Sequence, residues 1–232
     1  MSTTSPQDSY IQPTSDPAPT PKRRRIWLVL GIAGGVVAVI VANVVATGGK
    51  GESGLPEAEF ALTLPKTLLD NRYELTQDLS DTAGQNIQDM VVTEPWADRV
   101  TDAKVATYSL GGVEADGALM ISGVEGRFQS VDGSRDGMMA GVGQTEGVTV
   151  TVKPKDFHPH GSDITVTCEV ATQQQADDTL TFPVCAWADG NTAAAVAHMA
   201  QEAYTQSPSD VDLAAAAETT LKVRSETRKA IR

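Results

Sequence analysis

The sequence predicts an α+β fold, an antiparallel sheet packed with helices, preceded by a disordered tail and one transmembrane helix. Three observations support this prediction. Residues 26–46 are apolar almost throughout, several segments between 148 and 188 alternate apolar with polar residues, and segments on both sides of that region repeat apolar residues at helical spacing. A period of two is typical of half-buried strands and a period near 3.6 of amphipathic helices. Such elements pack as helices on a sheet.

Residues 1–25 predict a disordered cytoplasmic tail. They are rich in Ser, Thr and Pro and contain few apolar side chains. A segment of this composition cannot bury enough surface to offset the chain entropy that folding removes.

Residues 26–46 predict one transmembrane helix. These 21 residues carry no charge, and at 1.5 Å per residue they span about 31 Å, enough to cross a hydrocarbon core of about 30 Å. The apolar region of a signal peptide is shorter, about 7–15 residues. An uncleaved anchor is therefore favoured, with cleavage after Val44-Val45-Ala46 as the alternative.

Four cations set the predicted orientation of this helix. They lie directly before it, at Lys22, Arg23, Arg24 and Arg25. Because positive flanks stay in the cytoplasm, we expect a single-pass protein of the cell membrane with a cytoplasmic N-terminus and an extracytoplasmic C-terminal domain. Within the helix, Gly31 and Gly35 form a G-x-x-x-G pair, which lets two helices approach closely. A weak homodimer through this pair is one hypothesis, and ordinary glycine usage in membrane helices is the alternative.

The segment 47–61 predicts a flexible linker, and residues 62–232 predict one extracytoplasmic α+β domain. Residues 50–232 contain 14 of the 18 cations and 28 of the 30 anions, a net charge of −14. A domain this acidic is a poor binder of nucleic acid or anionic lipid, since both attract a positive surface. A basic protein or a cation is a more suitable partner, and the favoured alternative is that the acidic surface serves only solubility.

In the first half of the domain, apolar spacing predicts helices at about 77–92 and 130–143. In the second helix Val131, Met138 and Val142 are expected to point inward. Between the helices, strands are predicted at 105–110 and 118–124.

In the second half, strands are predicted at 148–153, 164–170 and 180–188, followed by the hairpin turn Asp189-Gly190-Asn191. Residues 192–199 return either as a strand or, given their alanines, as a helix. A last helix is expected from Ser207 to about Lys229.

Cys168 and Cys185 are the two cysteines of the chain. Outside the membrane they meet an oxidising environment, so we expect them to form a disulfide. A redox-active pair would favour C-x-x-C spacing, whereas 16 residues intervene here. A bond across two strands places Ile164, Val166 and Trp187 together on the cysteine face. The opposite face, which the helices are expected to cover, then holds Leu180, Phe182 and Val184.

Four residues between the strands form the main candidate for a metal site. Asp156, His158, His160 and Asp163 offer imidazole and carboxylate ligands that suit Zn²⁺ or Cu²⁺. The alternative is a polar turn, because His-Pro and Gly-Ser-Asp are turn-forming sequences. We favour the turn and expect no cofactor.

The chain contains no G-x-S-x-G, Walker or H-E-x-x-H motif. His198 lies in an alanine-rich apolar run, which predicts a packed side chain rather than a base. With a short tail, one anchor, a linker and an acidic domain, the sequence favours a membrane-tethered interaction or sensing module without catalytic activity, with an envelope protein as partner. An extracytoplasmic enzyme or a domain that binds a small ligand or metal is the alternative.

Short motifs at 21–25 (PKRRR), 64–69 (LPKTLL), 126–128 (GRF), 166–169 (VTCE) and 183–189 (PVCAWAD) are spread over most of the chain. With these motifs the chain resembles the uncharacterised single-pass membrane-anchored proteins of high-GC Gram-positive bacteria (actinobacteria). The resemblance implies the same topology and disulfide. It implies no activity, because that group has no established function.

Overall fold

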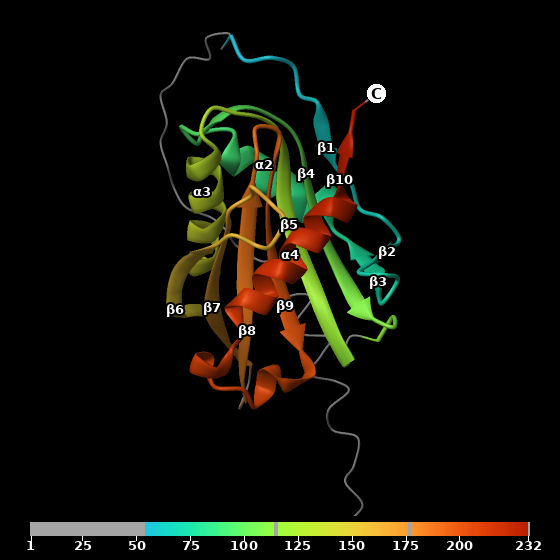
Figure 1. The fold of residues 1–232 in the computed structure, drawn as a ribbon, viewed down its shortest axis with the longest axis vertical. Coiled ribbons are helices and arrows are strands. Elements are labelled where there is room, and N and C mark those ends of the chain that lie inside the picture. The colour runs from blue at the N-terminus through green and yellow to red at the C-terminus, as the bar shows by residue number, and fades with distance from the viewer. Residues whose placement is uncertain (1–53, 114–115, 176–177, 232) are drawn as a thin grey trace, which may run out of the picture.

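A computed structural model of the chain describes residues 54–113, 116–175 and 178–231 (Figure 1). The predicted tail, the transmembrane helix and most of the linker lie outside these residues, and so do the cations at 22–25 and the glycine pair Gly31 and Gly35. Within the described ranges, no helix is both long enough and apolar enough to span a membrane.

The centre of the domain is an eight-stranded sheet in which every neighbouring pair is antiparallel. In spatial order its strands are β2 (Thr67–Leu68), β3 (Tyr73–Asp78), β4 (Ala97–Leu110), β5 (Gly117–Phe128), β9 (Thr192–Ala200), β8 (Asp178–Ala188), β7 (Val166–Gln175) and β6 (Val148–Phe157). The connections between β3 and β4 and between β5 and β6 carry helices, whereas β7, β8 and β9 follow one another directly.

Helices cover both faces of this sheet. A π-helical turn at Ser80–Gly84 leads into α2 (Gln85–Val91), and α3 (Val131–Gly143) follows β5. On the opposite face α4 (Leu213–Thr227) packs on β7 and β8, and Figure 1 shows it crossing the sheet. The domain is therefore α+β, with an antiparallel sheet between layers of helix.

A two-stranded sheet joins the beginning and the end of the domain. Strand β1 (Phe60–Leu62) pairs antiparallel with β10 (Arg228–Ala230), and the two lie side by side in Figure 1. The last two residues of the predicted linker, 60 and 61, thus belong to β1.

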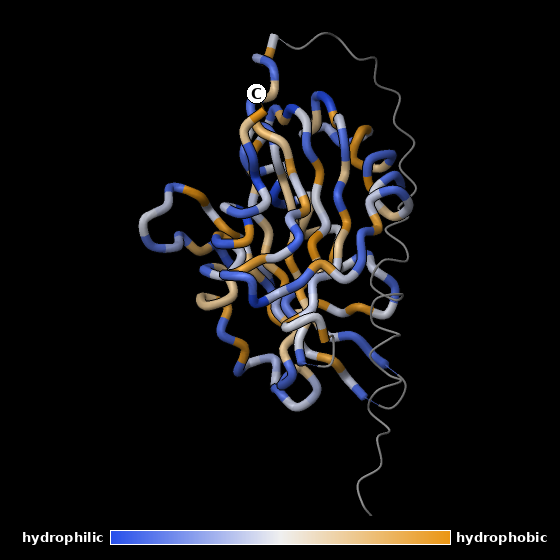
Figure 2. Tube along the Cα trace, turned by 90° about the vertical axis from the view of Figure 1, so that its right-hand side faces the viewer, coloured by the Kyte–Doolittle hydropathy of each residue, from blue (hydrophilic) through white to orange (hydrophobic). Residues whose placement is uncertain are grey.

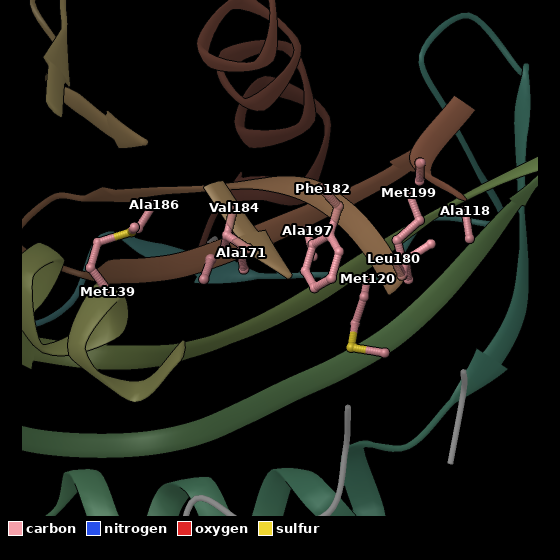
Figure 3. Close-up of a cluster of buried hydrophobic side chains, with 12 residues drawn as sticks. Ala118, Met120, Met139, Ala171, Leu180, Phe182, Val184, Ala186, Ala197 and Met199 are labelled. Atoms are coloured by element: carbon pink, nitrogen blue, oxygen red, sulfur yellow. The ribbon is translucent and has the colours of Figure 1, made fainter. Parts of the chain in front are cut away.

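Alternation along the strands divides the core into two sides, as expected for a sheet covered on both faces. On the α3 side a cluster of buried side chains includes Leu180, Phe182 and Val184, and Figure 3 shows Met139 of α3 beside Ala186. On the α4 side lie the disulfide, Val166 and two alanines of α4. Figure 2 shows polar and apolar residues following one another along the strands.

The predicted disulfide between Cys168 and Cys185 is confirmed. The two residues are direct partners in the β7–β8 ladder, and their Cα atoms are 4.0 Å apart. Val166 pairs with Trp187 on the same face. Ile164 packs against the buried cluster that contains Trp187 and against the one that contains Val166. The alternation of the two predicted strands was sufficient to place these side chains together.

Residues 192–199, for which the sequence left strand and helix open, belong to β9. Alanine favours a helix by intrinsic propensity, but here five residues of β9 pair with β8 and nine pair with β5. Small side chains suit this central strand because α3 packs closely on one of its faces. Tertiary pairing therefore overrides the local preference.

Three predicted details of the helices are wrong. The helix expected at 77–92 starts later, because residues 77 and 78 belong to β3, which pairs with β4. The helix expected from Ser207 starts at Leu213, where the Asp212 side chain accepts a hydrogen bond from the Ala215 amide, and it ends at Thr227 because β10 pairs with β1. Val131 is 40% exposed rather than inward, while Met138 and Val142 pack on the core.

Candidate functional site

A groove between α2 and α3 is a concave site in the described part of the chain. Its volume is ≈ 180 Å³. Helix α2 contributes Ile87 and Met90 to its lining, α3 contributes Gly137 and Met138, and β5 contributes Ser122. Since Met90, Met138 and Ser122 are only half-buried, the groove is open to an incoming group.

Two glycines of α3 line the groove, and one of them packs directly against Trp96. Gly137 and Gly141 are four residues apart, so they lie on the same side of α3, and both line the groove. A Cβ atom at Gly137 would lie 2.6 Å from the indole nitrogen of Trp96. Glycine at this position therefore permits the close approach of helix and indole.

Trp96 forms the inner wall of the groove at the end of the α2–β4 connection. It is 7% exposed and packs edge-on against Phe128, with ring centroids 5.6 Å apart and an interplanar angle of 69°. Its Nε1 is buried and has no hydrogen-bond partner among the described residues. A buried N–H without a partner costs about 1–3 kcal/mol, and the backbone of Gly137 packs directly against this one.

The composition of the groove suits binding rather than acid–base chemistry. Glu94 is the single titratable side chain among the residues that line it. Its volume is close to the ~150 Å³ of an engineered cavity that holds benzene, and below the ~300–1,000 Å³ typical of sites for drug-sized ligands. Methionine side chains adapt their shape to different apolar partners. The groove therefore fits one aromatic ring or one branched aliphatic group.

A buried carboxyl group lies under another part of α3. Glu169 of β7 is 2% exposed, and its Oε1 has no hydrogen-bond partner in the described structure. Burial raises the pKa of Glu169 to about 7. A buried carboxyl group with a pKa near neutrality often belongs to a functional site.

Close to Glu169, three polar side chains connect α3 to β7 and β6. Arg135 donates from Nε to Thr167 Oγ1 over 2.8 Å and from Nη2 to Asp132 Oδ1 over 2.9 Å. The Thr167 hydroxyl in turn donates to Asp156 Oδ1. The Arg135 side chain thus already donates hydrogen bonds to two acceptors.

His198 is a packed side chain, as the sequence predicts. Its Nε2 lies 3.0 Å from the Tyr73 hydroxyl, and the two rings meet edge to face. Burial, together with the charge of Arg72, lowers the pKa of His198, and burial raises that of Tyr73. The pair joins β3 to β9 on the α4 side of the sheet, away from the groove.

The four residues of the candidate metal site are not brought together. Asp156 accepts from Thr167, His158 Nδ1 lies 3.5 Å from the Thr165 hydroxyl, and the backbone amide of His160 donates to Glu218. Asp163 is exposed. Among the residues that the structure describes, no group of three or more His, Cys, Asp or Glu side chains is placed to hold a metal ion.

Sequence reasoning did not identify the groove. Met138 was predicted to point inward, but the role of Trp96 depends on its contact with Gly137, which is 41 positions later in the chain. The available signal was the pair Gly137 and Gly141, because glycines on one side of a predicted helix indicate a close neighbour. Comparison with protein-family models, with curated proteins and with solved structures finds no match for the chain.

Proposed function

We propose that this protein is a membrane-tethered, extracytoplasmic interaction module, and that its α2–α3 groove receives one apolar side chain from a basic segment of an envelope protein. The observation that carries this proposal is the groove itself, a mostly apolar site of ≈ 180 Å³ with a single carboxyl group in its lining. A peptide segment supplies an apolar side chain for this site and can carry basic residues on either side of it.

Size and charge both support a protein segment as the occupant. The groove holds about one ring or one branched side chain, which corresponds to a single anchor residue, and such anchors carry much of the energy of protein interfaces. Glu94 lines the groove, and residues 50–232 carry a net charge of −14. Complementary charge therefore favours a basic segment around the anchor.

The proposed location is supported by the sequence and agrees with the disulfide. Residues 26–46 are long and apolar enough for one membrane helix, and the cations at 22–25 orient it. The disulfide between Cys168 and Cys185 is typical of an oxidising compartment.

The binding part is tested with the full chain in lipid nanodiscs, labelled with ¹³C at the methionine methyl groups. N-acetylphenylalanine amide and N-acetylleucine amide are titrated as probes of an anchor residue with flanking carbonyl groups. We expect the signals of Met90 and Met138 to shift and that of Met199, buried elsewhere in the α3-side core, to stay. No shift at millimolar probe would contradict the proposal, and free indole or toluene binding better than the amides would indicate a small apolar ligand instead.

Two matched variants sharpen this test. Gly137→Ala places a Cβ against Trp96 and should abolish the shifts, whereas Gly143→Ala, whose Cβ would lie 3.6 Å from Val150, should leave them unchanged. The location is tested separately by protease treatment of intact spheroplasts, which should degrade the C-terminal domain. A domain that becomes accessible only after lysis would contradict the proposed topology.

A further inference from the structure

Glu169 lies between β7 and α3. The residues two positions away on either side share its face of the strand: Thr167 binds Arg135 of α3, and Ala171 belongs to the core cluster that contains Met139 of α3. Its partner across the ladder, Val184, belongs to the same cluster. A carboxyl group therefore occupies a position where these three neighbours pack on the side of the sheet that α3 covers.

The charged groups on the elements around Glu169 leave this carboxyl uncompensated. On α3, Arg135 is held by Thr167 and Asp132, and Asp136 is exposed. On β6, Asp156 accepts from Thr167, Lys155 lies over the Phe157 ring and Lys153 is exposed. Strand β8 contributes only Asp178, at its far end. Burial is accordingly the one cause that shifts the titration of Glu169.

We infer that α3 stays seated on the sheet while Glu169 is protonated, and that ionisation of this carboxyl loosens the helix. A neutral carboxyl group can remain in a dry, apolar layer, whereas a carboxylate without a cation or donor strongly favours water. Exposing Glu169 to water requires the packing between α3 and β7 to open, since Thr167 and Ala171 on the same face both pack with this helix.

The pKa of Glu169, raised to about 7, places this change in the physiological range. The sign follows from proton linkage. The folded domain binds this proton more tightly than the opened one, so the seated helix is favoured at low pH and is progressively disfavoured as the pH rises from about 4.5 to about 7. Above that range the carboxyl is ionised in both states and the effect levels off.

The same helix forms one wall of the α2–α3 groove, through Gly137, Met138 and Gly141. If the groove binds an apolar side chain, as proposed above, loosening of α3 should weaken that binding. This second consequence rests on the proposed function, whereas the proton-linked seating of α3 does not. The extracytoplasmic pH would then control the availability of the groove.

The test is hydrogen–deuterium exchange of the full chain in nanodiscs at pH 6 and pH 8, corrected for the intrinsic pH dependence of exchange. We expect the opening of α3 in the wild type to increase about tenfold over this range. Glu169→Gln, which keeps the shape of the neutral form, should remove the increase. Glu146→Gln removes an exposed carboxyl just after α3 and should behave like the wild type.

A second measurement keeps the inference testable if Glu169→Gln does not fold. The side-chain carboxyl carbon of Glu169 in the ¹³C-labelled wild type should titrate with a midpoint near 7. A midpoint below 5, or an exchange increase that persists in Glu169→Gln, would overturn the inference. Pronounced pH-dependent exchange without any binding of the amide probes would retain the inference and refute the proposed function.

Discussion

Gly137 and Trp96 are in direct contact, and no side chain would fit between them. A Cβ atom at Gly137 would lie 2.6 Å from Nε1 and 2.9 Å from Cε2 of the indole. The contact fixes the spacing between α3 and the inner wall of the groove. It also makes the groove sensitive to the smallest substitution that a glycine can undergo.

Gly137→Ala should lower the free energy of unfolding by about 1–3 kcal/mol, because the added methyl group overpacks a filled site. Gly143→Ala is the matched control on the same helix, where the Cβ has ordinary room. It should stabilise the domain by about 0.5–1 kcal/mol through helix propensity. Urea unfolding followed by tryptophan fluorescence measures both. Equal stabilisation by the two substitutions would show that the contact is not rigid.

Removal of the disulfide should destabilise the domain markedly. Cys168 and Cys185 are almost completely buried beneath α4, and their bond closes a loop across two strands. Replacing both by alanine should lower the free energy of unfolding by about 2–4 kcal/mol. Guanidinium unfolding with and without reductant measures this loss. The double variant should no longer respond to reductant, and an unchanged wild type under reductant would contradict the prediction.

Asp189 should be the most important carboxylate of the α4 side. Its Oδ2 lies 2.8 Å from Arg224 Nη2 and 2.7 Å from Arg228 Nε, and its Oδ1 accepts from the amides of Asn191 and Thr192. Asp189→Asn leaves two partly buried arginines without their anion. A loss of about 3 kcal/mol is expected, and the exposed Asp163→Asn should change stability little.

The pH dependence of this cluster has the opposite sign from that of Glu169. Burial raises the pKa of Asp189, but the hydrogen bonds from Asn191, Thr192 and Arg224 outweigh it, so the pKa lies below its ordinary value. Its contribution is therefore full above about pH 4 and is lost as the pH falls through the folded pKa. Thermal unfolding between pH 2 and pH 5 should show a steeper loss in the wild type than in Asp189→Asn.

Gly123→Ala should displace β1. A Cβ at Gly123 would lie 2.5 Å from the Ala194 side chain and 2.7 Å from Leu62, which is the buried end of β1. We expect faster amide exchange over Phe60–Leu62 and a loss of about 1–3 kcal/mol in stability. Gly190→Ala meets no atom within 4 Å and is the control. Unchanged exchange in β1 would contradict the prediction.

The periodicity of apolar residues predicted a strand or helix correctly where that element buries one clear face. Alternation identified β7 and β8 and placed Cys168 and Cys185 on one face, and helical spacing located α3 within one residue at its start. It failed where a boundary depends on a distant partner. The first helix starts later than predicted because its expected first residues pair with β4 as part of β3. The last helix ends earlier than predicted because the following residues pair with β1 as β10.

The sequence by itself determined the antiparallel α+β class, the disulfide pair and the position of α3, because each follows from the periodicity of neighbouring residues. Its apolar run and flanking cations also define the predicted anchor. Only the tertiary structure decided the groove and the state of Glu169. The groove requires Trp96 to meet Gly137, and the carboxyl of Glu169 is buried on the face of β7 that packs against α3. Both depend on contacts between segments far apart in the chain, which no local period encodes.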